Sequence, residues 1–485
     1  MLGRHLLGYM PVQAAQALVG FGGVAILTRL MPTDMYGRYA LALTAMHLGG
    51  MALFSWLDAA VARFHARSAR RGAISAHLQT AYIFFAALAA ATFVVCGLAL
   101  YVAPIGAELK TALAYALAAL VIKSALQIGK ETRRAAGQVA MYSGLETLNL
   151  LLGFAVGIGL LMATPLGAAG PLAGMVVGSL VTLVFDLPGQ FGRMKNGKAN
   201  AKRAAIYFAY GLPVSISLVF EHLLSAGDRF LIAGMLGESA VGIYSAGYGL
   251  ADRTLDIIFI WLGAAAAPLT IAALEHKGLG AARELAGRTA RIMALIAFPA
   301  AAGLALVAAP LAGVMVGEEF RAGAIQILPW IALAGLMNGM MTYYFHEAFT
   351  LKRRTRSMAT IMAIAALMNI AMNLLLIPLF GIAGAAAATV LAYGFGLVAC
   401  AIVGRKIFAL PLPWMDWGKA ALATAMMAGA IVYLPMPDAP FLALFLKAIV
   451  GGIIYVSAAL ALNAAGCRSW IGDARALLKP AEAAS

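Results

Sequence analysis

Apolar runs about 20 residues long recur from one end of this chain to the other. An α-helix rises about 1.5 Å per residue, so a run of this length crosses the hydrocarbon core of a bilayer, which is about 30 Å thick. Only 11% of the residues are charged and 63% are hydrophobic, whereas roughly 25% of the residues in a soluble domain are charged. The sequence therefore predicts an all-α polytopic membrane protein.

Fourteen such runs predict about 14 transmembrane helices. The first follows Arg4, but it is too long for the apolar core of a signal peptide and leads into Arg29, so we interpret it as a retained helix. The connections are short and leave no room for a soluble domain. The expected spans are 8–30, 39–62, 78–101, 107–128, 139–163, 167–188, 204–234, 240–268, 289–310, 322–345, 356–377, 382–403, 418–435 and 441–465.

The basic residues are unevenly distributed between the two sides of the membrane. With a cytoplasmic N-terminus, 27 Lys and Arg residues lie in inner segments and at most 5 in outer segments. This split follows the positive-inside rule, so the net charge of +15 reflects orientation and anionic lipid headgroups, and nucleic acid is not an expected partner. The expected location is the bacterial inner membrane, with both termini in the cytoplasm. Cys96, Cys400 and Cys467 lie in distant spans and predict neither a disulfide framework nor a metal site.

The two halves of the chain contain similar stretches. YGRYALAL at 36–43 matches VGIYSAGY at 241–248, and LGAAGPLAG at 166–174 matches FGIAGAAAA at 380–388. Six spans separate the copies, so both halves have the same orientation, as in transporters with parallel repeats. The predicted domains are a first six-helix lobe, a second six-helix lobe, and two accessory helices with a cytoplasmic tail, at 1–190, 191–405 and 406–485.

Two hairpins resemble those of a known family. DRFLIAGMLGESAVGIYSAGY at 228–248 resembles the seventh-to-eighth span hairpin of bacterial polysaccharide flippases, and NIAMNLLLIPLFGIAGAAAATVL at 369–391 resembles their eleventh-to-twelfth hairpin. With the span count and the two lobes, the chain is similar over essentially its whole length to the Wzx-like branch of the multidrug/oligosaccharidyl-lipid/polysaccharide exporter superfamily.

This resemblance implies two six-helix lobes around a central cavity, followed by two C-terminal helices. Family members flip undecaprenyl-diphosphate-linked oligosaccharides across the bacterial inner membrane by alternating access, for the synthesis of O-antigen, capsule or exopolysaccharide. The implied partners are this lipid-linked substrate, membrane lipids, H⁺ or Na⁺ as a coupling ion, and a polysaccharide polymerase. Neither an enzymatic activity nor a cofactor is implied.

Three other functions remain as alternatives. A lipid II flippase has the same fold and a similar substrate. Many cation-coupled multidrug exporters of this fold use an acidic residue in the first span, yet residues 8–30 contain none. A membrane glycosyltransferase or ligase usually needs a sizeable outer loop with acidic catalytic residues, and no outer loop here exceeds about a dozen residues.

Adjacent charges at Asp228 and Arg229 interrupt the apolar run LLSAGDRFLIAGMLG at 223–237. On insertion scales each charge costs roughly 2.5–3.5 kcal/mol at the centre of a membrane helix. Charged groups at that depth face a bundle interior or a wet cavity and have partners. Two interpretations are open: a structural ion-pair network, or a lining of the translocation cavity in which Arg229 alternates between Asp228 and a phosphate.

The neighbouring helix supplies further charges at a similar depth. If the outward turn is centred near residues 238 and 239, Asp252 and Arg253 lie beside residues 228 and 229. Arg229 and Arg253 are the predicted contacts to the diphosphate, because a guanidinium binds phosphate with several donors in one plane. The four nearby acids outnumber these two arginines and leave a formal charge of about −2, which predicts protonation or a bound coupling cation. The predicted ion-coupling acids are Asp252, Asp256 and Glu221.

Four further residues are candidates with structural alternatives. Lys123 adds a positive charge from the first lobe, or extends to the inner headgroups. His47 aligns with Asp252 in the repeat and is a candidate to titrate with the transport cycle, or is a packing residue. Asn369 and Asn373 lie four residues apart on one helix, where they bind sugar hydroxyls or join helices.

Two other polar groups are interpreted as structural. The cluster from Tyr343 to Glu347, ahead of Lys352, is interpreted as an interfacial belt. Asp58 is expected to pair with Arg63 near the inner end of the second span.

Overall fold

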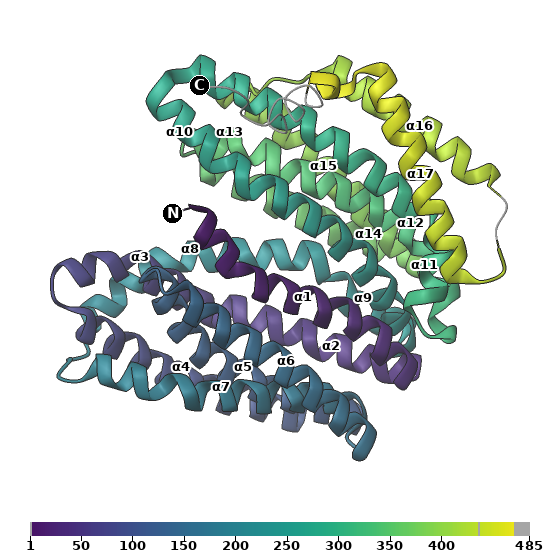
Figure 1. The fold of residues 1–485 in the computed structure, drawn as a ribbon. Helices are drawn as coiled ribbons and strands as arrows, with labels where there is room; N and C mark the ends of the chain where they lie inside the picture. The colour runs from purple at the N-terminus through teal and green to yellow at the C-terminus, as the bar shows by residue number, and fades with distance from the viewer. Residues whose placement is uncertain (1, 435–436, 470–485) are drawn as a thin grey trace, which may run out of the picture. The chain divides into compact units, whose positions relative to one another are not determined.

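The computed structural model describes residues 2–434 and 437–469, and their side chains except those of 2–7 and 264–268. The described residues form helices and no strand (Figure 1). Within this described part of the chain, twelve segments are long and apolar enough to span a membrane; the expected spans 240–268 and 418–435, which include residues 264–268 and 435 outside that description, are not among them. The predicted all-α polytopic class is confirmed. The chain divides into two compact units, residues 1–246 (unit 1) and 247–485 (unit 2).

Unit 1 contains nine α-helices and the beginning of α10 (Glu238–Leu306), which continues into unit 2. A π-helical turn, η1 (Gly50–Phe54), joins α2 to α3, and a 3₁₀ turn, η2 (Gly167–Ala169), precedes α7. The nine helices are α1 (Leu2–Leu30), α2 (Thr33–Gly49), α3 (Ser55–Arg70), α4 (Ile74–Val102), α5 (Ala107–Ala135), α6 (Val139–Ala163), α7 (Gly170–Met194), α8 (Ala201–Ala226) and α9 (Asp228–Leu236).

Glycines bring α6 and α7 into close contact. Gly153 and Gly157 on α6 lie against Gly174 and Gly178 on α7. A Cβ on Gly174 would overlap the backbone of Gly157, and a Cβ on Gly178 would lie 2.7 Å from the Cα of Gly153. Small residues four apart on both helices allow this approach, as is common in membrane helix pairs.

This packing predicts that Gly174→Leu destabilises the protein. The added side chain has no space at the α6–α7 contact, and overpacking typically costs about 1–3 kcal/mol. Gly159→Leu is the matched control, because a Cβ at Gly159 on α6 meets no atom within 4 Å. Thermal unfolding in detergent should show a lower midpoint for Gly174→Leu alone; equal midpoints for the two variants would contradict the packing argument.

Helix α8 packs on α3 within unit 1. Gly211 lies against the backbone of Trp56, and the hydroxyls of Ser55 and Ser215 are 2.7 Å apart. The repeat assigns residues 191–405 to the second lobe, whereas α8 belongs to the first compact unit. The lobe boundaries at 190 and 405 stay a prediction.

The described residues of unit 2 form the rest of α10, seven further α-helices and two short turns. The segment between the expected spans 240–268 and 289–310 is helical, because α10 continues on both sides of Gly278 and only this glycine, with φ 83°, departs from helical geometry. Ala281, Ala282, Arg283 and Glu284 favour a helix here although the segment is polar. The other elements are α11 (Ala308–Met315), α12 (Glu318–Met340), η3 (Met341–Phe345), α13 (His346–Leu351), α14 (Thr355–Phe380), α15 (Ile382–Ile407), α16 (Trp414–Tyr433), α17 (Pro440–Leu462) and η4 (Ala464–Gly466).

A single glycine makes the turn between α14 and α15. Gly381 has φ 60° and ψ −139°, a conformation that glycine adopts without the steric cost of a Cβ. Gly384 then lies against the carbonyl of Leu376, which holds the two helices together. The spans expected at 356–377 and 382–403 are therefore confirmed.

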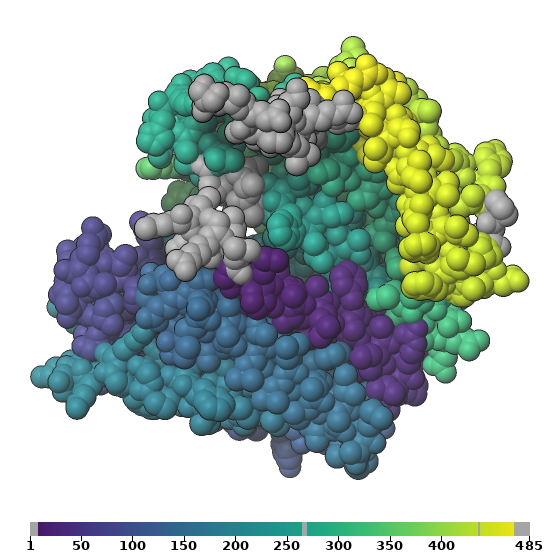
Figure 2. All heavy atoms as spheres, viewed as in Figure 1, coloured from purple at the N-terminus to yellow at the C-terminus, as the bar shows by residue number. Residues whose placement is uncertain are grey.

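Helices α16 and α17 are anchored to α10 by polar side chains. The Tyr455 hydroxyl donates to the carbonyl of Leu295, Trp417 Nε1 donates to that of Ala290 at 3.1 Å, and Lys447 Nζ donates to that of Leu306 at 3.4 Å. Figure 2 shows the side chains of these helices (yellow) on the surface of unit 2. Many are apolar and exposed, as expected for groups that face lipid: Val432, Phe441, Phe445, Ile453 and Val456.

Candidate functional site

Asp228 lies buried at the start of α9, directly after Gly227, which separates α9 from α8. Its carboxylate accepts a hydrogen bond from the hydroxyl of Tyr244 on α10. Arg229 Nη1 lies 3.4 Å from the Asp228 carboxylate and 3.2 Å from the carbonyl of Ser225. A carboxylate in the first turn of a helix is also favoured by the helix dipole.

Arg229 is held on one side and partly accessible on the other. Its guanidinium lies 5.9 Å from the centroid of the Tyr244 ring, and 11% of its side chain is exposed. Asp228 and Tyr244 therefore fix the direction of the guanidinium through contacts inside unit 1. The structural interpretation of this pair is supported, and a phosphate contact for Arg229 stays a prediction.

Glu221 and His47 are exposed in unit 1. The His47 ring on α2 lies edge-on to the ring of His222 on α8, with 6.1 Å between centroids. The structure thus places one predicted ion-coupling residue beside a histidine that the sequence analysis did not single out. The roles of Glu221 and His47 in coupling stay predictions.

The remaining charged candidates lie on the part of α10 that belongs to unit 2. Asp252 is half-buried, while Arg253 and Asp256 are exposed. Asp256 lies four residues after Asp252, so both carboxylates project from one side of the helix. The expected grouping of these residues with Asp228 and Arg229 stays a prediction.

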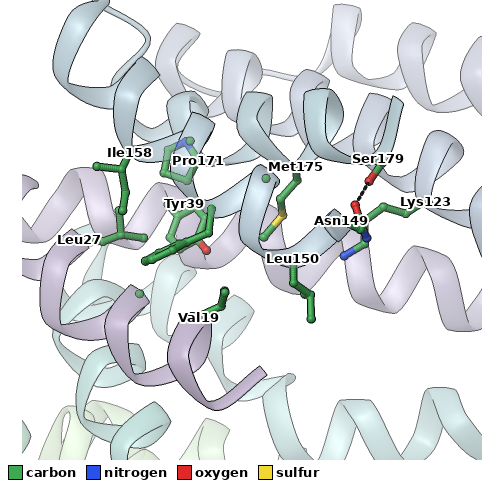
Figure 3. A pocket seen from close by; sticks show the side chains of 14 residues that line it. Val19, Leu27, Tyr39, Lys123, Asn149, Leu150, Ile158, Pro171, Met175 and Ser179 are labelled. Carbon is green, nitrogen blue, oxygen red and sulfur yellow. Dashed lines mark hydrogen bonds between the residues drawn. The ribbon is translucent and has the colours of Figure 1, made fainter. Parts of the chain in front are cut away.

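Lys123 lines a small cavity inside unit 1 (Figure 3). The cavity has a volume of about 60 Å³ and is bordered mainly by apolar residues of α1, α6 and α7. Figure 3 shows Asn149 and Ser179 beside Lys123 at one end, with Ser179 Oγ donating to Asn149 Oδ1 at 2.9 Å. This volume accommodates water-sized groups only, so a contact between Lys123 and substrate would need another conformation.

Asn369 and Asn373 are buried in α14. Asn373 Nδ2 donates to the side-chain oxygen of Asn369 at 3.0 Å and to its carbonyl at 2.9 Å. Asn369 Nδ2 and Asn373 Oδ1 remain without a partner. The two amides therefore have hydrogen-bonding capacity left, and their predicted contacts to sugar are untested.

Reciprocal contacts join the two copies of the repeat. A Cβ on Gly37 would overlap the carbonyl of Glu238, and a Cβ on Gly242 would overlap that of Thr33. Thr33 and Gly37 are the repeat counterparts of Glu238 and Gly242, because the offset is 205. Beside them, the hydroxyls of Thr33 and Ser239 are 2.8 Å apart.

Arg38 adds an ionic cluster next to this contact. It pairs with Asp34 at 2.8 Å, with Glu238 at 2.5 Å, and also with Glu108. The sequence analysis counted Arg38 only as an outer charge. Its position directly after Gly37, in the stretch 36–43 whose repeat copy at 241–248 lies just after Glu238, is the signal that could have identified it.

Charged residues inside unit 1 form a second network that the sequence analysis missed. Arg133 Nε lies 2.7 Å from Asp186, and Lys130 pairs with Glu146. The expected pairing of Asp58 with Arg63 is absent from the ion pairs of the described residues. The charges that act on Asp58 are those of Glu131, Lys130 and Arg134, on the neighbouring α5.

The interpretation of residues 343–347 as an interfacial belt is wrong for Tyr344 and Glu347. Tyr344 is fully buried and its hydroxyl donates to the carbonyl of Pro411; Glu347 is 8% exposed. Helical periodicity does not reveal this, because the π-helical turn η3 shifts the register of the side chains that follow it.

Comparison with solved structures shows a shared transporter fold. The lipid II flippase MurJ in an inward closed conformation aligns with 96% of this chain and 100% of its own, with a TM-score of 0.78 and 12% identity. An inward-facing multidrug resistance MATE family transporter aligns with 87% of this chain and 95% of its own, with a TM-score of 0.64 and 16% identity. A MOP superfamily transporter from Pyrococcus furiosus aligns with 88% of this chain and 95% of its own, with a TM-score of 0.57 and 14% identity.

Family membership is shown by sequence. None of the curated proteins matches this chain. The family model described as polysaccharide biosynthesis protein, however, matches residues 26–324, more than half of the chain. The fold of flippases and exporters agrees with this match, which confirms the family expected from the two hairpins. The chain therefore belongs to the polysaccharide biosynthesis protein family and is a multi-pass membrane protein with the fold of a MOP superfamily transporter.

Proposed function

We propose that this protein flips undecaprenyl-diphosphate-linked oligosaccharides from the cytoplasmic to the outer leaflet of the bacterial inner membrane. The observation that carries this proposal is the polysaccharide biosynthesis family match on a chain with the flippase fold. The product would serve the synthesis of O-antigen, capsule or exopolysaccharide, with a polysaccharide polymerase as the next protein to receive it.

The chemistry of the substrate fits the charged residues of the chain. A diphosphate carries negative charge that must cross the membrane core, and guanidinium groups bind phosphate through several coplanar donors. Arg229 is held by Asp228 and Tyr244, so little side-chain freedom would be lost on binding. Arg253 is the second proposed anion contact, and Lys123 is proposed to add a further positive charge. Asn369 and Asn373 are proposed to bind sugar hydroxyls.

Alternating access requires the outer side to open and close. We infer that the reciprocal contact of Gly37 and Gly242, with the Arg38 cluster beside it, is the outer closure. The charge distribution supports an outer location for these residues, since the basic segments at 63–77 and 189–203 are expected inside. Release of the glycan would separate the Arg38 guanidinium from Glu238.

The topology is tested by labelling single cysteines in a variant without the three native ones. Cysteines at 72, 196 and 353 should react only when a membrane-impermeant reagent reaches the cytoplasm, and a cysteine at 106 should react from outside. The reason is the split of 27 inner to at most 5 outer basic residues. Labelling of position 72, 196 or 353 from outside would contradict the proposed orientation.

Transport itself is tested with purified protein in liposomes that contain a labelled lipid-linked oligosaccharide. The expected result is that labelled lipid in the inner leaflet moves to the outer leaflet. There the label becomes accessible to an enzyme added outside the liposomes. Lipid II and a cationic dye serve as parallel substrates. Flipping of lipid II alone would identify a lipid II flippase, and uptake of the dye alone would identify a multidrug exporter.

A further inference from the structure

Glu347 on α13 is a buried acid whose carboxylate has no partner. Its side chain is 8% exposed, and both carboxyl oxygens are buried without a hydrogen bond. Among the described residues, no basic group lies within ion-pair distance of it. A buried carboxylate anion without a compensating charge is costly, and such a group neutralises instead.

Glu347 borders a cavity in unit 2. The cavity has a volume of about 130 Å³, enough for a few water molecules. Hydroxyl groups in its wall already donate elsewhere: Thr350 to the carbonyl of His346 at 3.1 Å, and Thr342 to Asn338 at 3.2 Å. These hydroxyl oxygens retain the capacity to accept a hydrogen bond, which a protonated carboxyl can donate and a carboxylate cannot.

Few other titratable groups face this cavity. Tyr343 of η3 and His346 of α13 line it, and His346 Nε2 is buried without a partner. From α10 the described lining residues are Gly263 and Ile271, which do not titrate, and α14 and α15 contribute none. The basic residues at the inner ends of α14 and α15, Arg356, Arg405 and Lys406, are exposed. A metal ion is disfavoured, because the described residues contain no group of three acidic, histidine or cysteine ligands.

The backbone is distorted directly before Glu347. The π-helical turn η3 ends at Phe345, and π-helical turns frequently occur at functional sites. On the facing α10, the ring of Phe259 stacks on that of Tyr343 with 5.9 Å between centroids, and a Cβ on Gly263 would overlap the Tyr343 ring. Helix α10 is thus closely fitted to the distorted turn, so a change in the charge of Glu347 would act on this contact.

We propose that Glu347 is a proton-binding site. A hydronium ion that reaches the cavity loses one O–H bond and becomes water, and its proton forms an O–H bond with the carboxylate. The neutral acid then donates a hydrogen bond to a threonine hydroxyl or to His346 Nε2. Loss of this proton to water restores the carboxylate in another conformation, with no redox change. Proton binding stands without the proposed function, whereas its use in driving transport rests on that function.

Infrared spectroscopy of the full-length protein in nanodiscs tests proton binding directly. A carbonyl stretch of a protonated carboxylic acid should be present at pH 7, be lost in Glu347→Gln, and shift in frequency in Glu347→Asp. Glu275→Gln is the matched control, since Glu275 is an exposed acid on α10, and it should leave this band unchanged. Absence of the band at pH 7, or its removal by Na⁺ at constant pH, would overturn the proposal.

A transport measurement tests the use of the proton. In liposomes with an imposed pH gradient, Glu347→Gln should lose the stimulation by the gradient and keep the rate observed without one. An unchanged stimulation would exclude Glu347 from coupling, whatever the infrared result. If the unmodified protein moves no lipid-linked oligosaccharide, the proposed function fails, and the infrared band still decides whether Glu347 binds a proton.

Discussion

Replacing Arg229 with alanine should abolish glycan export while the protein still accumulates in the membrane. A hydrogen bond to a charged group contributes about 1.5–3 kcal/mol, and a guanidinium can offer two to a diphosphate. A loss of about 3–6 kcal/mol corresponds to at least a hundredfold weaker interaction, at about 1.4 kcal/mol per tenfold. Arg253→Ala should behave alike, and lysine at either position should rescue only in part, because a point charge replaces a planar fork.

The pairing of Arg229 with Asp228 calls for a double variant. If Arg229 serves only to neutralise Asp228, then Asp228→Asn combined with Arg229→Ala should export glycan, since neither charge remains. If Arg229 binds the diphosphate, the double variant should stay inactive. Arg356→Ala, at an exposed position after α13, is the matched control and should export normally. Full export by both Arg229→Ala and Arg253→Ala would remove these arginines from the mechanism.

Asp252→Asn and Asp256→Asn should each bind substrate but fail to complete the transport cycle. Asparagine preserves the shape of the side chain and fixes its charge at zero, so affinity for an anionic substrate can no longer follow the proton or sodium gradient. The count of four acids and two arginines among the candidates favours such coupling. Glu221→Gln is a further test of the same idea.

Liposome transport with and without an imposed gradient provides the measurement. The unmodified protein should respond to a pH gradient, a Na⁺ gradient or a membrane potential, and the two variants should not. Asp438→Asn, at an exposed position between α16 and α17, should respond normally. A rate in the unmodified protein that is indifferent to all three gradients would leave these acids as structural residues.

The fold could be predicted from the sequence because its main determinants are local. The span expected at 139–163 has the same bounds as α6, since the bilayer fixes the length of an apolar helix and the residues at each end stop it. The turn at Gly381 was likewise marked by a residue suited to positive φ. By contrast, the helical structure of 275–288 could not be predicted from apolar periodicity, because the segment is polar, although its residues form helices readily.

The candidate site could be predicted only in part. The sequence identified Asp228 and Arg229 because charges stand out in an apolar run. It could not show that Tyr244 would donate to Asp228, since that contact depends on the angle between α9 and α10. Glu347 was misinterpreted for a similar reason: which face of a helix is buried depends on its neighbours and, here, on a π-helical turn that adds a residue to the register.

The reciprocal contact of Gly37 and Gly242 has an evolutionary consequence. Gly37 of the first copy lies against Glu238 of the second, and the counterparts of these residues, Gly242 and Thr33, lie against each other as well. Such a reciprocal interface is isologous, as in a twofold homodimer. A chain of one repeat could have made this interface with an identical subunit. Gene fusion then allows asymmetry that a homodimer cannot have: Arg38 pairs with Glu238, whereas its counterpart is Ile243, and that of Glu238 is Thr33. Covalent linkage therefore allows one side of this interface to carry a charge pair that the other side lacks.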